Sequence, residues 1–308
     1  MNTSQSTDAP RLDALPGMED LVENIRKSEC TLFVGSAVHA PPPKNSPYRY
    51  PENARPPLGS ELAEKLAEKC HYQDKFPGES AKDLQRVSLC FETEATLRRG
   101  HLVDTLDSLL RRGKEPSAAL KMLASLPFKI IVTTNYDQLL ETALRSQPDP
   151  KDPSVYVYNP QFHELTPKVE PDPSVQHPLL FKMHGDLDHR SSIVITDEDY
   201  ITFIQRMSTS SDDYHPVPGV VRGKMQEWPT LFVGYSLKDY NLRLLFRTLR
   251  WGIDLVDVPL SYSVDRSPDP LIRSVWQDQN KLVAFIAEDI WTFVPWLYKK
   301  IHGKEFEG

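Results

Sequence analysis

The chain has 308 residues, 39% hydrophobic and 26% charged, a composition typical of a globular protein with one large domain. Its 36 basic residues against 43 acidic ones give a net charge of −7, which argues against a general nucleic-acid-binding protein. The polar N-terminus has no apolar core of a secretory signal, and no apolar run approaches the roughly 20 residues that span a bilayer, so we expect a cytoplasmic protein without membrane contact.

The first part of the chain is predicted to form one strand and several helices. A short helix is expected over residues 17–28, followed by a buried strand over 30–36. Residues 41–57 contain seven prolines and must form a loop, because proline fixes φ and removes a backbone donor. Further helices are predicted over residues 59–70 with Ser60 as N-cap, over 81–112 with breaks near Gly100 and Gly113, and over 116–126.

From residue 128 onward, strands alternate with helices. Strands are predicted over residues 128–134, 178–186, 230–236, 260–265 and 282–287, with a shorter one opening the stretch 191–207. Helices are predicted over residues 135–146 and 237–251, at the end of 191–207, and near 270–279 and 289–301. The alternation, with strands that are apolar throughout, predicts an α/β fold: a Rossmann-like, mostly parallel sheet with helices on both faces.

We interpret residues 1–308 as a single domain of this kind. The helical stretch of about 60–126 is predicted to be an insert or subdomain within it, and residues 1–16 are expected to be flexible.

Four predicted strands end in glycines and polar residues. These ends are Gly35-Ser36-Ala37, Thr134-Asn135-Tyr136-Asp137, His184-Gly185-Asp186 and Gly234-Tyr235-Ser236. The carboxyl ends of parallel strands lie on one edge of the sheet, and ligands bind there at the point where the strand order reverses. The sequence therefore predicts that these four ends converge on one crevice.

Helix capping is the simpler explanation for some of these residues. Thr134-x-x-Asp137 and Ser236-x-x-Asp239 both match a capping box, in which the hydroxyl accepts from a free amide of the first helical turn. Asn135 would be the first residue of the helix, where capping requires no side chain. It is therefore the stronger candidate for a ligand-binding residue.

A histidine at a strand end can also be purely structural, but His184 is the histidine with the most suggestive setting; the other eight have no comparable one. HxH, HExxH and Cys/His clusters are absent, so we predict no metal site. Cys30, Cys70 and Cys90 are too scattered for a disulfide framework, and we expect reduced, buried thiols. GxSxG, Walker A and kinase motifs are absent, which removes the commonest hydrolase and NTPase interpretations.

Taken in order, "LFVGSA", "TTNYD", "KMHGD" and "LFVGYSLKDYNLR" resemble motifs of the sirtuin-like NADase domains of bacterial anti-phage defence systems. The resemblance covers roughly residues 18–300. The first motif departs from the family, which usually has Gly-Ala-Gly followed by a small polar residue, and the proline-rich loop 41–57 stands where the family usually has a short Gly/Pro segment. Sirtuin deacetylases also carry a four-cysteine zinc module, which three scattered cysteines cannot build.

The resemblance implies NAD⁺ as substrate and cleavage of its nicotinamide–ribose bond. In the family's pattern, His184 is the general base, Asn135 orients the water and the ribose, and Asp137 holds the nicotinamide-ribose side. Backbone amides after Gly35, with Ser36, would meet the pyrophosphate. The full set of implied NAD⁺-binding residues is Gly35, Ser36, Ala37, Thr134, Asp137, Gly234, Ser236, Asp239 and Asn241.

A free NADase would deplete its own cell, so the resemblance implies an effector of anti-phage defence that stays inactive until triggered. We expect a homo-oligomer and a sensor or activator on a separate chain, such as an Argonaute-like protein, an ATPase or a phage protein, with no direct nucleic-acid contact. Two alternatives stay open. One is a non-catalytic module that binds NAD⁺ or a related nucleotide and signals by assembly, and the other is an ADP-ribosyl transferase or deacylase.

Overall fold

The computed structural model describes residues 12–94, 96–158, 172–208, 216–235, 259–279 and 282–307. Its centre is a seven-stranded sheet in which all neighbouring strands pair in parallel, in the order β3-β4-β2-β1-β5-β6-β7. The strands are β1 (Thr31–Val34), β2 (Ile130–Thr133), β3 (Ser154–Val157), β4 (Leu179–Lys182), β5 (Thr230–Val233), β6 (Ser261–Val264) and β7 (Val283–Ile286). The predicted Rossmann-like α/β architecture is confirmed.

The strand order reverses beside β1. The chain first builds β2, β3 and β4 on one side of β1, and then returns to place β5, β6 and β7 on the other. Val34, the last residue of β1, therefore lies between Thr133 of β2 and Val233 of β5. Such a reversal opens a crevice at the carboxyl ends of the strands, because the connections on its two sides run in opposite directions.

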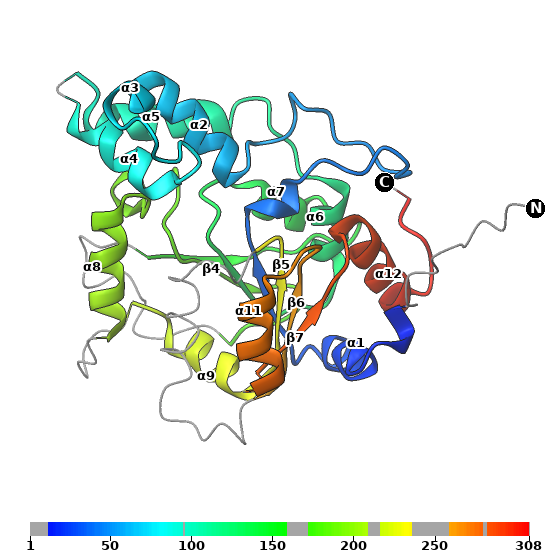
Figure 1. Cartoon of the computed structure of the whole chain (residues 1–308). Helices are drawn as coiled ribbons and strands as arrows, with labels where there is room; N and C mark the ends of the chain where they lie inside the picture. The colour runs from blue at the N-terminus through cyan, green and yellow to red at the C-terminus, as the bar shows by residue number, and fades with distance from the viewer. Residues whose placement is uncertain are drawn as a thin grey trace, which may run out of the picture.

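Helices cover both faces of the sheet, and for this reason all residues of β1, β2, β4 and β5 are buried. Figure 1 shows α1 and α12 to one side of the strands, and α8 and α9 to the other. The core on the first face takes apolar side chains from α1 (Met18–Arg26), α6 (Ala118–Ser125), α7 (Leu139–Arg145) and α12 (Ile290–His302). The core on the second face takes them from α8 (Asp197–Ser208), α9 (Gly219–Glu227), α11 (Pro270–Arg273) and the π-helical η4 (Ser274–Gln279).

A separate group of helices packs around a third core. Figure 1 shows α2, α3, α4 and α5 gathered at the top of the molecule, away from most of the sheet. These helices are α2 (Gly59–Cys70), α3 (Tyr72–Lys75), α4 (Leu84–Thr93) and α5 (Arg98–Leu110). Their buried leucines meet Tyr136, Ile193 and Ile195, which come from the segments that follow β2 and β4. The helical group therefore packs against the loops at the carboxyl edge of the sheet.

Several local predictions are wrong in their details. The predicted break near Gly100 lies a few residues earlier, because Gly100 is inside α5 and the chain leaves its helical path between Thr93 and Arg98. Ser60 is not the N-cap of α2. That cap is Leu58, whose backbone amide donates to Glu61 Oε2 at 2.8 Å.

The strand predicted at the start of 191–207 does not form: the 3-10 helix η3 (Arg190–Ser192) is followed by residues 193–195 without regular secondary structure and then by α8. The edge strand β3 and the helices α3 and α9 were not predicted, since short, partly exposed segments carry little periodicity. The helix predicted over 237–251 lies outside the described residues. None of the helices in the described ranges combines the length and apolar character needed to cross a membrane.

Candidate functional site

A pocket of about 890 Å³ lies at the carboxyl ends of β1, β2, β4 and β5. The segments that follow these strands line it with Ser36, Ala37, His39, Thr134, Asn135, Tyr136, Asp137, His184, Gly234 and Tyr235. The remaining walls come mainly from α2 and the segment before it, from residues 82–85 and from Tyr200 of α8. The structure thus brings the four predicted strand ends together. Ser236, Asp239 and Asn241 lie outside the described residues.

The ends of β1 and β5 touch through two glycines. A Cβ on Gly35 would lie 2.4 Å from the Gly234 carbonyl oxygen, and a Cβ on Gly234 would lie 2.3 Å from the Val38 nitrogen. Gly234 also has a φ of +70°, which side chains disfavour. Both positions therefore require glycine, because the two backbones meet without room for a side chain.

The amides that follow β1 are mostly committed to this turn. Gly35 N donates to Val233 O at 3.0 Å, Ala37 N to Gly234 O at 2.9 Å, and Val38 N to Gly35 O at 3.1 Å. Gly35 does not line the pocket, whereas Ser36 and Ala37 do. In this arrangement, Ser36 is the residue of the motif best placed to meet a ligand.

The turn after β2 is built differently from the predicted capping box. α7 begins at Leu139, and Asp137 Oδ1 accepts from the Leu139 amide at 2.9 Å. Thr133, and not Thr134, organises the turn: its hydroxyl donates to Val34 O at 2.9 Å and accepts from the Asn135 amide at 3.1 Å. Asn135 is therefore not the first residue of a helix but part of an irregular turn that lines the pocket. Its side-chain amide forms no hydrogen bond with any residue that the structure describes, which leaves it available to a ligand.

A tight turn presents His184 at the end of β4. Gly185 has a φ of +89°, and a Cβ there would lie 2.2 Å from the Ser192 carbonyl oxygen. The His184 carbonyl accepts from Val194 N at 2.9 Å, which ties the turn to the segment before α8. Only glycine fits this turn, so the residue that follows His184 is glycine for a structural reason.

The imidazole of His184 is 5% exposed and packs edge-on against Tyr200 and Phe203 of α8. The Tyr200 hydroxyl lies 3.2 Å from His184 Nδ1. Burial lowers the pKa of His184 to about 3, so the ring is neutral at pH 7. Sequence reasoning missed Tyr200, because nothing in the pattern of α8 distinguishes it from other aromatic residues on a buried helical face.

A buried lysine ties the turns after β2 and β4 together. Lys182 Nζ donates to the Asp137 carbonyl at 2.5 Å and to Glu141 Oε1 at 3.0 Å, and it forms an ion pair with Asp186. Burial opposes the charge of Lys182, but the Glu141 and Asp186 carboxylates outweigh it and raise the pKa of Lys182. Sequence reasoning missed this network. Its signal was a lysine at the end of an otherwise apolar strand, where only a paired charge can be buried.

The proline-rich loop forms a wall of the pocket. Pro56 and Pro57 line it, and Arg55 holds the end of the loop on α2 through a two-pronged ion pair with Glu61, at 2.8 and 3.0 Å. The Tyr50 side chain is buried, and its hydroxyl donates to the Glu115 carbonyl at 2.8 Å. The loop is therefore packed against the body of the protein beside the four strand ends.

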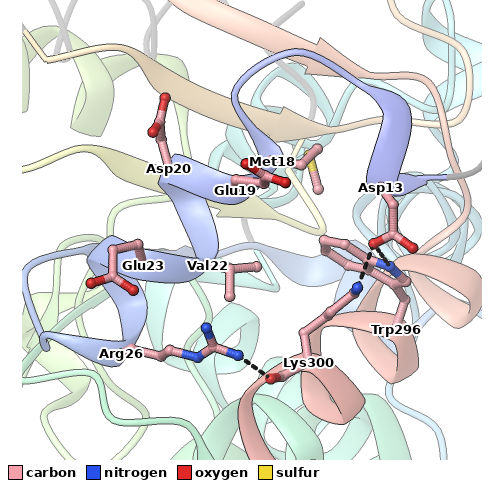
Figure 2. A pocket seen from close by; sticks show the side chains of 9 residues that line it. All are labelled: Asp13, Met18, Glu19, Asp20, Val22, Glu23, Arg26, Trp296 and Lys300. Carbon is pink, nitrogen blue, oxygen red and sulfur yellow. Dashed lines mark hydrogen bonds and ion pairs between the residues drawn. The ribbon is translucent and has the colours of Figure 1, made fainter.

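A second pocket of about 510 Å³ lies between η1 (Leu12–Ala14), α1 and α12. Figure 2 shows that some of its polar groups engage one another: Lys300 Nζ and Trp296 Nε1 both contact Asp13 Oδ1, at 2.7 and 3.2 Å, and Arg26 donates to the Lys300 carbonyl at 2.8 Å. It contains none of the strand-end residues. The strand-end pocket is therefore the candidate active site, and among the described residues no cluster of three or more His, Cys, Asp or Glu could hold a metal ion.

Comparison with protein families matches residues 129–284 to the SIR2-like domain. The chain belongs to the SIR2-like domain family. The matched segment runs from β2 into β7, so it includes the turn with Asn135 and the turn with His184. The resemblance inferred from the motifs is confirmed.

Curated relatives of this SIR2-like chain are named as NAD⁺ hydrolases or as a defence-associated sirtuin. "NAD(+) hydrolase ThsA" of Enterococcus faecium is 31% identical over 169 residues, which are 55% of this chain and 32% of that protein. "NAD(+) hydrolase ThsA" of Bacillus cereus (strain MSX-D12) is 34% identical over 210 residues, 67% of this chain and 40% of that protein. "Defense-associated sirtuin 2" of Bacillus subtilis is 22% identical over 241 residues, which are 76% of this chain and 20% of that protein. The chain thus spans less than half the length of each of these relatives.

Proposed function

We propose that this SIR2-like chain is an NAD⁺ glycohydrolase that cleaves the nicotinamide–ribose bond with water and releases nicotinamide and ADP-ribose. The observation that carries the proposal is that Asn135 and His184, on the turns after β2 and β4, line one pocket at the carboxyl edge of a SIR2-like sheet. Relatives named NAD(+) hydrolase support the choice of reaction.

The chemistry makes modest demands on the protein. When the C1′–N bond breaks, its electron pair returns to the pyridinium nitrogen, so nicotinamide leaves as a neutral molecule and needs no proton. Positive charge builds on the ribose, water attacks C1′, and the attacking water loses one proton. The site must therefore hold the ribose and the water in place and accept a hydrogen bond from that water as the new C–O bond forms.

His184 is the group proposed to accept this hydrogen bond. If Nδ1 carries the ring hydrogen and donates to Tyr200, Nε2 is left as the acceptor. With a pKa of about 3, His184 is neutral at pH 7 and holds a proton only transiently before passing it to solvent. Asn135 supports this role, because its amide has both a donor and an acceptor for the water and the ribose.

The remaining pocket residues are assigned to substrate binding. Asp137 would hold the nicotinamide-ribose side. Ser36 and Ala37 would meet the pyrophosphate beside Gly234, in the turn that Gly35 makes possible. Thr134 lines the same pocket and is assigned to the nucleotide as well. Ser236, Asp239 and Asn241 are assigned to the phosphates or the adenosine ribose. No protein metal ligand is invoked in any of these roles.

The biological setting that we propose is anti-phage defence in the cytoplasm. An NADase that was always active would consume the NAD⁺ of its own cell, so we propose that the chain acts as a homo-oligomer that a sensor on another chain activates. The defence-associated name of the Bacillus subtilis relative supports this setting. An Argonaute-like protein, an ATPase or a phage protein are the candidate activators.

The test is to incubate the purified protein with NAD⁺ and to quantify nicotinamide, ADP-ribose and protein-bound ADP-ribose, alone and with the proteins encoded beside it. Equal amounts of nicotinamide and free ADP-ribose are expected, and the His184→Ala protein should release both at least ~100-fold more slowly. Protein-bound ADP-ribose would instead indicate a transferase. Binding of NAD⁺ without release of nicotinamide under every condition would indicate a nucleotide-binding module and overturn the proposal.

A further inference from the structure

A second histidine lies in the same pocket and has no part in the chemistry described so far. His39 follows the turn after β1, is 2% exposed, and lines the pocket together with Asn135 and His184. Its Nε2 atom is buried and has no hydrogen-bond partner among the described residues. A buried polar atom without a partner is costly, and in a ligand pocket it indicates a group that the ligand satisfies.

The tautomer of His39 follows from its neighbours. The Tyr50 hydroxyl lies 3.2 Å from His39 Nδ1 and donates its only hydrogen to the Glu115 carbonyl at 2.8 Å. A carbonyl can only accept, so the hydroxyl oxygen must accept from His39, and Nδ1 carries the ring hydrogen. Nε2 is then left as an acceptor. Burial also lowers the pKa of His39, which keeps the ring neutral at pH 7.

The unpartnered nitrogen faces the carboxylate of Asp137. His39 Nε2 lies 3.9 Å from Asp137 Oδ2, while Oδ1 of the same carboxylate accepts from the Leu139 amide. With Nδ1 protonated, neither Nε2 nor Oδ2 has a hydrogen to offer the other. Two acceptors that face each other across a pocket wall are both satisfied by a ligand that donates hydrogen bonds.

We propose that His39 is a substrate-binding residue: Nε2 of His39 and Oδ2 of Asp137 together accept hydrogen bonds from a neutral N–H or O–H donor of the substrate. This inference rests on the proposed function, since the donor belongs to NAD⁺. Two parts of NAD⁺ supply such donors, the carboxamide of nicotinamide and the hydroxyls of a ribose. An anionic group is rejected at this position, because it would meet a carboxylate and a lone pair.

The alternative is that His39 only fills space beneath the loop that carries Tyr50. In that case, replacing His39 would change the stability of the fold but not the binding of the substrate. Two substitutions separate the roles. His39→Asn keeps a polar group near Nδ1, in reach of Tyr50, and removes the group at Nε2. His39→Gln extends an amide to the position of Nε2, so it restores an acceptor there.

The experiment measures nicotinamide release by the activated protein, as kcat and KM, and the binding of NAD⁺ to each variant in a His184→Ala background. His39→Asn is expected to raise KM and the dissociation constant for NAD⁺ about 10-fold to 100-fold, the scale of one or two hydrogen bonds in a buried site, with kcat within about threefold. His39→Gln should recover a large part of this loss. Thermal melting of each variant checks that the fold is kept.

Two substrate analogues identify the donor. In the 3-acetylpyridine analogue of NAD⁺ a methyl group replaces the carboxamide NH₂, and the 2′-deoxy analogue of the nicotinamide ribose lacks one hydroxyl. The analogue that lacks the donor should bind the wild-type protein more weakly than NAD⁺ does. In His39→Asn this difference should be smaller, because only Asp137 Oδ2 is left to accept from the donor. Unchanged NAD⁺ binding by a folded His39→Asn protein would overturn the role of His39 but leave the proposed function standing. A wild-type protein that neither binds nor cleaves NAD⁺ would overturn the proposed function, and the role of His39 with it.

Discussion

The Tyr200 hydroxyl lies 3.2 Å from Nδ1 of His184, and the two rings meet edge to face with centroids 5.0 Å apart. Tyr200 belongs to the first turn of α8, whereas His184 follows β4, so the contact links a helix of one sheet face to the carboxyl edge of the sheet. The contact orients the ring, and if Nδ1 donates to the Tyr200 hydroxyl, Nε2 is left as the acceptor. In the proposed reaction Tyr200 is therefore a positioning residue that acts through His184.

Replacing Tyr200 by Phe is expected to lower kcat for nicotinamide release about 10-fold while KM changes little. The reason is that the ring of His184 keeps its packing but loses the partner that selects its tautomer. Tyr72→Phe is the matched control, because the Tyr72 side chain is also buried and its hydroxyl donates to Glu79 Oε2 at 3.1 Å, outside the pocket. Steady-state kinetics of both variants check this. Equal losses in both variants would mean that the effect is on the fold and not on His184.

His184→Ala and Asn135→Ala are each expected to reduce nicotinamide release by at least ~100-fold, the usual scale for removing an acid–base or orienting group. Neither should lower the melting temperature appreciably. Asn135 has no side-chain hydrogen bond within the described part of the chain, and removing a neutral, sparsely bonded imidazole leaves no buried charge. Product quantification together with thermal melting separates loss of chemistry from loss of fold. A folded His184→Ala protein with full activity would refute the mechanism.

The folded protein is expected to lose stability as the pH falls below 6.5. The pKa of His184 is lowered to about 3 by burial, so between pH 6.5 and 3 the unfolded chain binds this proton and the folded chain does not. The unfolding free energy therefore falls by about 1.4 kcal/mol per pH unit from this residue. Urea unfolding at pH 7, 6 and 5 should show a smaller slope for His184→Gln than for the wild type. Parallel slopes would show that His184 titrates normally.

The same low pKa has a consequence for catalysis. Because His184 is already deprotonated at pH 6, its titration should not produce an acid limb near pH 6.5 in kcat/KM.

The sequence was sufficient to predict six of the seven strands of the sheet, all except the edge strand β3, and the convergence of their ends, for a physical reason. Strands buried on both faces are continuous apolar runs, and parallel strands bring their carboxyl ends to one edge, so the polar residues after β1, β2, β4 and β5 had to meet. Asn135 and His184 were singled out as candidates in this way, and both line the pocket. Their detailed setting was not, because the capping pattern around Thr134 wrongly predicted a helix that begins at residue 135, whereas α7 begins at Leu139.

The residues that were missed act through contacts between distant segments. Tyr200 meets His184 across 16 positions, Lys182 meets Glu141 across 41, and Tyr50 meets Glu115 across 65. No local periodicity encodes such pairs. His39 was dismissed among the other histidines because only the folded chain brings it beside Asp137.

Lys182→Met is expected to lower the unfolding free energy by about 3–5 kcal/mol, the scale of removing one partner from a buried ion pair. The substitution leaves Glu141 and Asp186 without the cation that compensates them, and it frees the Asp137 carbonyl. Lys27→Met is the control: Lys27 pairs with Glu23 at 3.3 Å on the surface, and its loss should cost less than about 1 kcal/mol. Chemical denaturation measures both. A loss at Lys182 as small as at Lys27 would show that the buried network adds little to stability.

Gly185→Ala tests whether the turn after β4 positions His184. The new Cβ would lie 2.2 Å from the Ser192 carbonyl oxygen at a φ of +89°, so the turn must move, and we expect a loss of at least about 2 kcal/mol in unfolding free energy together with a large fall in nicotinamide release. Gly223→Ala in α9 is the matched control, because nothing lies within 4 Å of its Cβ and alanine favours a helix by about 0.5–1 kcal/mol. That variant should be equally or more stable than the wild type and retain its activity. Wild-type stability and kinetics in Gly185→Ala would show that the turn tolerates a side chain and that the glycine is not what holds His184 in the pocket.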